Sequence, residues 1–313
     1  MAFGDVGAAL VAWFLYPGFL FLFACAWAFE WFDRLTIARS QARVGPPWFQ
    51  PLADLIKLLA KEDLMPTGTK EVLAAGLPML ALASSLTAVL YVPIAGRAAL
   101  SFEGDLIVVL FLLSLPALCY FLAGRVTGGV YSLLGGNRSL LQYFSYEVPF
   151  MIALSGPAIL GGSWSIAQIA QHQDATGWGL LVQPLGFLLA IIGLIGKLKR
   201  DPLDIPKAKS EMVAGSLTEY SGRKLALWHL AMNVQAVVGV FLLVNAFMGG
   251  QSFHQPLLNG VGFALRSLLI VFALSGSSVL YARLRIDQLA NLGWRVLAPL
   301  GLLQILVILG IGR

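Results

Sequence analysis

Ionisable residues are concentrated in RDPLDIPKAKSEMVAGSLTEYSGRK, residues 200–224. On a helix, Asp204, Lys207 and Glu211 would share one face, where the lysine could pair with both acids. Glu219 lies near the same face, although a proline and a glycine interrupt the stretch. Small and apolar residues between the acids predict that part of the stretch packs within protein, where carboxylates can exchange protons near neutral pH. A solvated loop of mixed charge is the alternative.

Another carboxylate, Glu147, begins an apolar run in the segment LLQYFSYEVPF. A carboxylate at that depth in a bilayer is costly and usually faces a cavity or a partner. We interpret Glu147 as a proton-relay or coupling residue, with an interfacial anchor as the alternative. Just before it, Gly135, Gly136 and Asn137 predict a turn.

The sequence contains no motif for a nucleotide, a haem or a metal cluster. Cys25 and Cys119 lie inside apolar runs and read as small core residues. His172, His229 and His254 are isolated from one another, and a lone histidine is more often a packed residue than a ligand. We therefore predict no catalytic residue and no metal site in this chain.

Membrane helices must position these residues, because 58% of the chain is hydrophobic and only 12% is charged. Soluble domains carry roughly 25% charged residues. Eight segments approach the roughly 20 apolar residues that a span needs: 10–29, 72–94, 106–123, 147–162 with a start near 140, 179–196, 226–248, 261–281 and 294–311. The sequence thus predicts an all-α, polytopic integral membrane protein with about eight transmembrane helices in a single membrane domain, residues 1–313.

Basic residues alternate between the connecting segments. All but three of the 21 Lys and Arg residues follow the first, third, fifth and seventh expected spans. By the positive-inside rule, loops 30–70, 125–145, 197–225 and 282–293 face the cytoplasm. Both termini are then predicted on the outer, periplasmic side of the inner (plasma) membrane.

The first of these loops contains an amphipathic pattern, GPPWFQPLADLIKLLAKED. Pro51 suits the first turn of a helix. Asp54, Lys57 and Lys61 would then share one face, with leucines opposite. Because this helix is too short and too charged to span, we predict that it lies at the interface or against the bundle. A generic surface connector is the alternative.

The chain resembles a family of membrane subunits of respiratory complex I, known as subunit 1 or the H subunit. The same family includes the equivalent membrane subunits of energy-converting, membrane-bound NiFe hydrogenases and formate hydrogenlyase. Four stretches carry the resemblance, in order and over nearly the whole chain: GPPWFQPLADLIKLLAKED, GGNRSLLQYFSYEVP, DPLDIPKAKSEMVAGSLTEYSG and ARLRIDQLANLGWRVLAPL.

The resemblance implies a membrane anchor and coupling subunit of a complex I-like, redox-driven proton pump. Such a subunit belongs to a multisubunit oxidoreductase and translocase but holds no redox centre. The implied partners are the iron–sulfur small subunit and catalytic large subunit of a hydrophilic arm, docked on the four loops, with antiporter-like and small membrane subunits beside it. Those partners would carry 4Fe-4S clusters and, in hydrogenases, a NiFe centre; a quinone would bind at the interface in complex I. Nucleic acid is not an expected partner.

Carried over by motif, Asp204, Glu211 and Glu219 match acids of the family's loop between its fifth and sixth core helices, and Glu147 matches the carboxylate of the SYE segment. The matching stretches also supply six residues expected at the arm or the membrane interface: Arg43, Trp48, Gln50, Asp54, Lys57 and Arg138.

One departure concerns Lys207 and Lys209, which stand where quinone-reducing members usually show acids in a PEAE-like form. A lysine beside a carboxylate lowers that acid's pKa and changes how the site handles protons. We therefore favour the hydrogenase-like branch, with the quinone-chamber subunit of NADH:quinone oxidoreductase as the alternative. A stand-alone secondary transporter is more distant, because no internal repeat is evident.

Overall fold

The structure is a computed structural model that describes residues 18–249 and 256–311. Within these ranges the regular elements are helical, apart from one isolated antiparallel bridge between Ile94 and Arg97. The first half contains α2 (Phe19–Ser40), α3 (Gln50–Ala60), α4 (Glu71–Val89), α5 (Asp105–Thr127) and α6 (Val130–Gly161). The second half contains α7 (Ile166–Thr176), α8 (Gly179–Val182), α9 (Pro184–Leu198), α10 (Lys209–Met212), α11 (Gly222–Phe247), α12 (Pro256–Leu280), α13 (Ile286–Asn291) and α14 (Ala298–Ile311).

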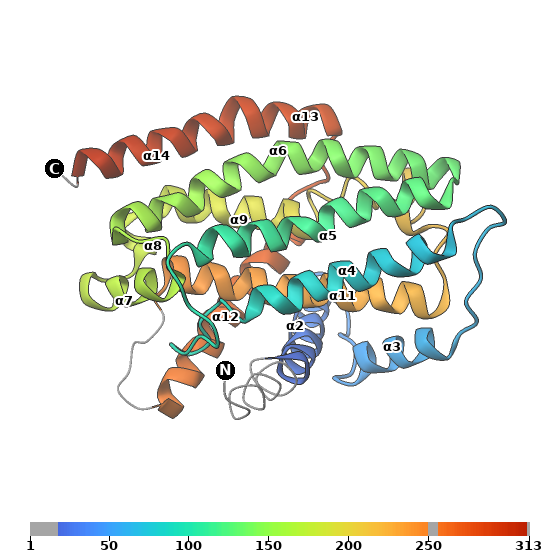
Figure 1. Ribbon diagram of the computed structural model, residues 1–313, viewed down its shortest axis with the longest axis horizontal. Helices are drawn as coiled ribbons and strands as arrows, with labels where there is room; N and C mark the ends of the chain where they lie inside the picture. Colours follow the sequence, from blue (N-terminus) through green and yellow to red (C-terminus); the bar gives the residue numbers. More distant parts are fainter. Residues whose placement is uncertain (1–17, 250–255, 312–313) are drawn as a thin grey trace.

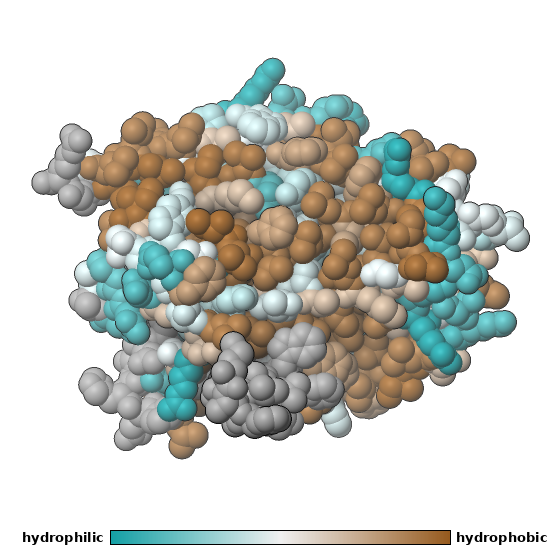
Figure 2. Space-filling model, in the orientation of Figure 1, coloured by the Kyte–Doolittle hydropathy of each residue, from teal (hydrophilic) through white to brown (hydrophobic). Residues whose placement is uncertain are grey.

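The long helices form a bundle in which α4, α5, α6 and α14 run side by side (Figure 1). Helix α11 lies at its centre: 83% of its apolar window is buried, whereas the other candidate spans reach at most 56%. Apolar side chains cover most of the face seen in Figure 2, and hydrophilic ones gather chiefly toward the ends of the helices. This distribution matches an all-α protein embedded in a bilayer, so the expected fold class is confirmed.

The helices long enough to span a membrane are fewer than the eight apolar segments of the sequence. In the described part of the chain, five helical segments are long and apolar enough to cross a membrane. Helices α6 and α7, bent by 60° relative to each other, make a sixth if the pair is counted as one span. Helix α9 is apolar but shorter. The first expected span, 10–29, begins outside the described residues. The count of eight therefore stays a prediction.

Helix α6 corrects one expectation. The turn predicted at Gly135, Gly136 and Asn137 is absent, because α6 runs unbroken through all three residues. A Cβ added at Gly135 would lie 2.6 Å from the Cα of Gly215. The glycine therefore permits close backbone packing instead of a turn. The expected loop 125–145 shrinks to Gly128 and Gly129, between α5 and α6.

Helices extend into two more of the expected loops. Helix α2 continues to Ser40, well into the predicted loop 30–70. The amphipathic segment of that loop forms α3, with Pro51 in its first turn. Near the other end of the chain, a π-helical segment, Leu292–Leu297, joins α13 to α14. Its Gly293 packs so closely on α6 that an added Cβ would overlap the carbonyl oxygen of Ser145.

Gly215, in the charged stretch 200–224, can be used to test how closely that stretch is packed. It has a φ of +60°, and an added Cβ would overlap the carbonyl oxygen of Pro206. Gly68 also has a positive φ, +94°, but no atom lies within 4 Å of its added Cβ. We expect Gly68→Ala to cost about 1–2 kcal/mol from the left-handed backbone, and Gly215→Ala to cost roughly 1–3 kcal/mol more from overpacking. The apparent Tm of the detergent-solubilised variants measures the difference; equal values would contradict it.

Candidate functional site

A buried ion pair joins α6 to α9. The amino group of Lys197 donates to Glu147 Oε1 over 2.8 Å, and the two side chains are 0% and 5% exposed. The Lys197 Nζ also lies 5.1 Å from the centroid of the Phe150 ring. Glu147 Oε2 has no hydrogen-bond partner in the described structure. A buried pair of this kind contributes little net stability while intact, but removing one partner leaves an uncompensated charge.

Two further lysines flank the ring of Tyr120. The Nζ atoms of Lys199 and Lys207 lie 4.6 Å and 5.9 Å from its centroid. Burial, together with the neighbouring charges of Lys207 and Lys197, lowers the pKa of Lys199 to about 7. Loss of hydration also lowers the pKa of Lys207, whose Nζ lies 3.0 Å from the Sδ of Met232. A lysine with a pKa near 7 changes protonation close to neutral pH.

Asp204 completes this group. Its carboxylate accepts a hydrogen bond from Arg283 over 3.2 Å, and its charge also acts on Lys199 and Lys207, opposing the fall of their pKa. Lys199 interacts electrostatically with Lys197, Lys207, Glu147 and Asp204. We call these five residues the charge cluster.

Gln142 fixes the backbone around the charge cluster. Its side-chain amide donates to the carbonyl oxygens of Gly196, in α9, and Leu203, in the loop that follows. One buried residue of α6 therefore holds the loop against the end of α9. The described structure has no helix between Leu198 and Lys209. The expected helical face shared by Asp204, Lys207 and Glu211 is therefore wrong.

Glu211 lies away from the charge cluster. Its exposed carboxylate pairs with Arg138 of α6 at 2.5 Å, and the guanidinium lowers the pKa of Glu211. The part of the stretch that packs within protein does not include this acid, because its side chain is 56% exposed. The side chain of Lys209 lies outside the described residues.

Glu219 is partly buried against the start of α6, where an added Cβ at Gly129 would lie 2.5 Å from its Oε1. With Lys70 and Arg125 it lines a cavity of about 600 Å³. Two cations therefore line the same cavity as this acid, and no residue of the charge cluster lines it.

The residues expected at the arm or the interface lie mainly on and before α3. Asp54 accepts hydrogen bonds from Arg34 over 2.7 Å and from Gln50 over 3.0 Å. The Arg34 guanidinium lowers the pKa of that carboxyl. The backbone carbonyl of Trp48 accepts a bond from the Trp27 indole. Arg43 and Lys57 are exposed, and Arg138 pairs with Glu211 as described above.

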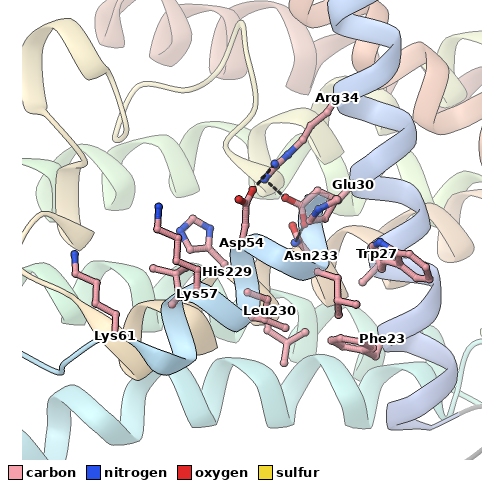
Figure 3. A pocket seen from close by; sticks show the side chains of 15 residues that line it. Phe23, Trp27, Glu30, Arg34, Asp54, Lys57, Lys61, His229, Leu230 and Asn233 are labelled. Carbon is pink, nitrogen blue, oxygen red and sulfur yellow. Dashed lines mark hydrogen bonds and ion pairs between the residues drawn. The ribbon is translucent and has the colours of Figure 1, made fainter. Parts of the chain in front are cut away.

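A cavity of about 410 Å³ lies between α2, α3 and α11 (Figure 3). Arg34 spans its polar end, where it pairs with both Glu30 and Asp54. Phe23 and Leu230 lie toward its apolar end. We call this space the α2–α3–α11 cavity.

Three cations of these sites were not predicted from the sequence: Lys197, Lys199 and Arg34. From the sequence, the two lysines indicate only the orientation of a span that they flank. The signal that could have led to Lys197 is that Glu147, an acid in an apolar run, needs a partner of opposite charge. Groups of three potential metal ligands do not occur in residues 18–249 and 256–311; the prediction that the chain binds no metal stays untested.

Comparisons of this sequence with known proteins lead to one family. A family model described as NADH dehydrogenase matches residues 14–309. The H subunit of the NADH-quinone oxidoreductase of Thermomicrobium roseum is 36% identical over 301 residues, covering 88% of each chain. The H subunit numbered 2 of the same enzyme from Geobacter sulfurreducens is 37% identical over 292 residues, again with 88% of each covered.

A solved structure shares the fold. It is a chain of a membrane-bound sulfane sulfur reductase, described as an archaeal respiratory membrane complex, with a TM-score of 0.87. The match covers 97% of this chain and 99% of that one at 23% identity. The resemblance drawn from the four sequence stretches is therefore confirmed. With a family model over almost its full length and relatives above 30% identity that are named H subunits of NADH-quinone oxidoreductases, this chain belongs to the NADH dehydrogenase family.

Proposed function

We propose that this protein is the membrane anchor and coupling subunit of a complex I-like, redox-driven proton pump, in which the charge cluster takes up and passes on protons. The observation that carries the proposal is the gathering of three lysines and two carboxylates in one electrostatically connected group inside the bundle. Ionisable residues inside a membrane bundle are costly, and their usual role is in an ion or proton path.

The geometry suggests an order of events. Negative charge arriving near Asp204 and Lys207 raises the pKa of Lys199, which then binds a proton. The new charge on Lys199 repels Lys197. This repulsion favours transfer of a proton from Lys197 to Glu147 Oε1, along the 2.8 Å hydrogen bond between them. When oxidation removes that negative charge, the pKa of Lys199 falls again and Lys199 releases its proton.

The proposed partners are an iron–sulfur small subunit and a catalytic large subunit in a hydrophilic arm, with antiporter-like membrane subunits alongside. Glu211 and Glu219 belong to the loop 197–225 that we expect to dock the arm, with Arg138 beside Glu211. We propose that both acids respond to the arm, and that the loops carrying them face the cytoplasm, with both termini periplasmic.

Two electron acceptors are candidates. The names of the relatives favour a quinone, as in NADH-quinone oxidoreductase. Lys207 favours a hydrogenase-like branch, because it brings a cation to the Tyr120 ring where quinone-reducing relatives usually have an acid. The identity of the large subunit separates these branches: a partner with a nickel-coordinating cysteine set supports the second.

Purification of the complex from native membranes in mild detergent tests the proposal. We expect an iron–sulfur subunit to co-purify, and the complex in proteoliposomes to translocate protons when supplied with its electron donor and acceptor. A chain that purifies alone and carries a solute across vesicles would instead establish a secondary transporter.

A further inference from the structure

A buried pair of glutamines joins α14 to the start of α9. The side-chain amide of Gln304 donates to Gln183 Oε1 over 3.0 Å, and each residue is 4% exposed. The other two polar atoms of the pair, Gln183 Nε2 and Gln304 Oε1, have no hydrogen-bond partner in the described part of the chain. Exchanging nitrogen and oxygen in both amides still leaves one donor and one acceptor unused. The pair therefore needs a ligand that both accepts and donates.

Two glycines shape the space around the two amides. A Cβ added at Gly156 of α6 would overlap Gln304 Nε2 and would lie 2.6 Å from Gln183 Oε1. A Cβ added at Gly186 of α9 would overlap the same Gln304 amide. Helices α6, α9 and α14 pack on one another (Figure 1), and at these glycines they leave room for both amides. The polar pair therefore occupies a built site between three helices, near the middle of the expected span 294–311.

A cavity of about 160 Å³ leads from the surface to this pair. Gln183 lines it together with His172 and Thr176 of α7, and Thr176 is exposed. The amide of Gln173, which also lines the cavity, is already bonded through both of its atoms to backbone groups. The unpartnered nitrogen of Gln183 therefore remains for a ligand. We call this space the α7–α9 cavity; its mouth lies on the side that the basic residues predict to be periplasmic.

The size of the α7–α9 cavity limits the ligands that fit. Sites for small organic molecules occupy about 300–1,000 Å³, more than this cavity offers. A water molecule in the liquid takes up about 30 Å³, so several waters fit. Water also matches the unused atoms, because one molecule can accept a hydrogen bond from Gln183 Nε2 and donate one to Gln304 Oε1.

The backbone at Gln183 agrees with a hydrated site. The helix is interrupted at this residue, between α8 and α9. Irregular backbone at membrane depth occurs where it is buried in protein or lines a water-filled cavity. Gln183 fulfils the second condition if the α7–α9 cavity holds water, since it is one of the lining residues.

We propose that Gln183 and Gln304 bind one ordered water molecule, which closes the amide pair, and that further waters reach it from the surface through the α7–α9 cavity. This water site goes beyond the coupling function and does not depend on it. The 14 positions from Gln183 to Lys197 correspond to about 21 Å along a helix. Buried apolar side chains, among them Phe187 and Leu194, lie between the two residues.

A cryo-EM map of the purified complex, at a resolution that shows ordered waters, tests the site. We expect a water density within about 3.2 Å of both Gln183 Nε2 and Gln304 Oε1, with further densities along the cavity toward His172. A buried water needs two to four polar partners. In Gln304→Leu, which removes one partner, the bridging density is therefore expected to be lost, whereas the waters near His172 remain.

Gly156→Ala and Gly161→Ala form a matched pair of variants on α6. The methyl group at Gly156 overlaps the Gln304 amide, whereas the one at Gly161 meets its neighbours at 3.6 Å or more, an ordinary contact distance. We expect the bridging water to be lost in Gly156→Ala and retained in Gly161→Ala.

Four outcomes would overturn the proposal: no density between the two amides of the unmodified complex, a lipid or detergent chain in the cavity, an unchanged bridging density in Gln304→Leu, or equal loss in both glycine variants. If a variant does not assemble, the map of the unmodified complex decides alone.

Discussion

Glu147→Gln is expected to abolish redox-driven proton transfer and to destabilise the protein. The variant leaves Lys197 charged and fully buried without its carboxylate, which lies 2.8 Å away in the unmodified protein. Removing one member of a buried pair costs about 3–5 kcal/mol. Loss of a proton-transferring group lowers the rate by about 100-fold or more. The measurements are proton uptake in proteoliposomes, at matched electron-transfer rate, and the apparent Tm of the complex.

A second variant separates the two effects of Glu147→Gln. Combining it with Lys197→Met removes both charges, so the complex is expected to regain stability, because neutral replacements of a buried pair are often tolerated. Proton transfer is expected to stay lost, since no titratable pair remains. Glu71→Gln, an exposed acid at the start of α4, controls for the loss of one carboxylate. Recovery of pumping in the double variant would make the pair purely structural.

The apolar runs predicted much of the bundle because burial in lipid depends on local composition. The third expected span, 106–123, became α5, Asp105–Thr127. The sixth, 226–248, became α11, Gly222–Phe247. In both, the helix extends a turn beyond the apolar run at one end, because backbone hydrogen bonds continue where the side chains turn polar.

The glycines of α6 show why local patterns failed. Gly135 in a GGN sequence normally indicates a turn, yet here it accommodates the backbone of Gly215, a residue 80 positions away. Only the tertiary structure distinguishes a glycine needed for a left-handed turn from one needed for close contact. The same limit applies to Asp204 and Lys207, whose spacing is helical but which lie in the loop before α10, next to the Leu203 carbonyl that Gln142 holds.

For a related reason, the sequence predicted Glu147 as a functional residue but did not predict its neighbours Lys197 and Lys199. Glu147 stood out because an acid in an apolar run has no local explanation. Lys197 and Lys199 did not stand out, because lysines at the end of a span agree with the positive-inside rule. Pairing across α6 and α9 depends on residues 50 positions apart, which composition and spacing within one segment do not relate.

Lys199 is expected to set the pH dependence of both stability and proton transfer. Its pKa is 10.5 when unperturbed and about 7 in the folded protein, so folding penalises the charged form. The penalty is fully present below pH 7 and fades as the pH rises from 7 to 10.5. Lys199→Met removes it, so the apparent Tm is expected to rise more at about pH 6 than at about pH 9. The limb of the proton-transfer profile near pH 7 is expected to disappear.

Lys199→Arg distinguishes titration from simple removal of the side chain. Arginine stays charged throughout this range, so the buried cation is retained on both sides of neutral pH, and the limb is again expected to disappear. Arg223→Met, at an exposed position, serves as the control for loss of one cation and should keep the unmodified profile. Because methionine and arginine bracket the two protonation states of Lys199, persistence of the limb in both variants would assign it to another group of the charge cluster.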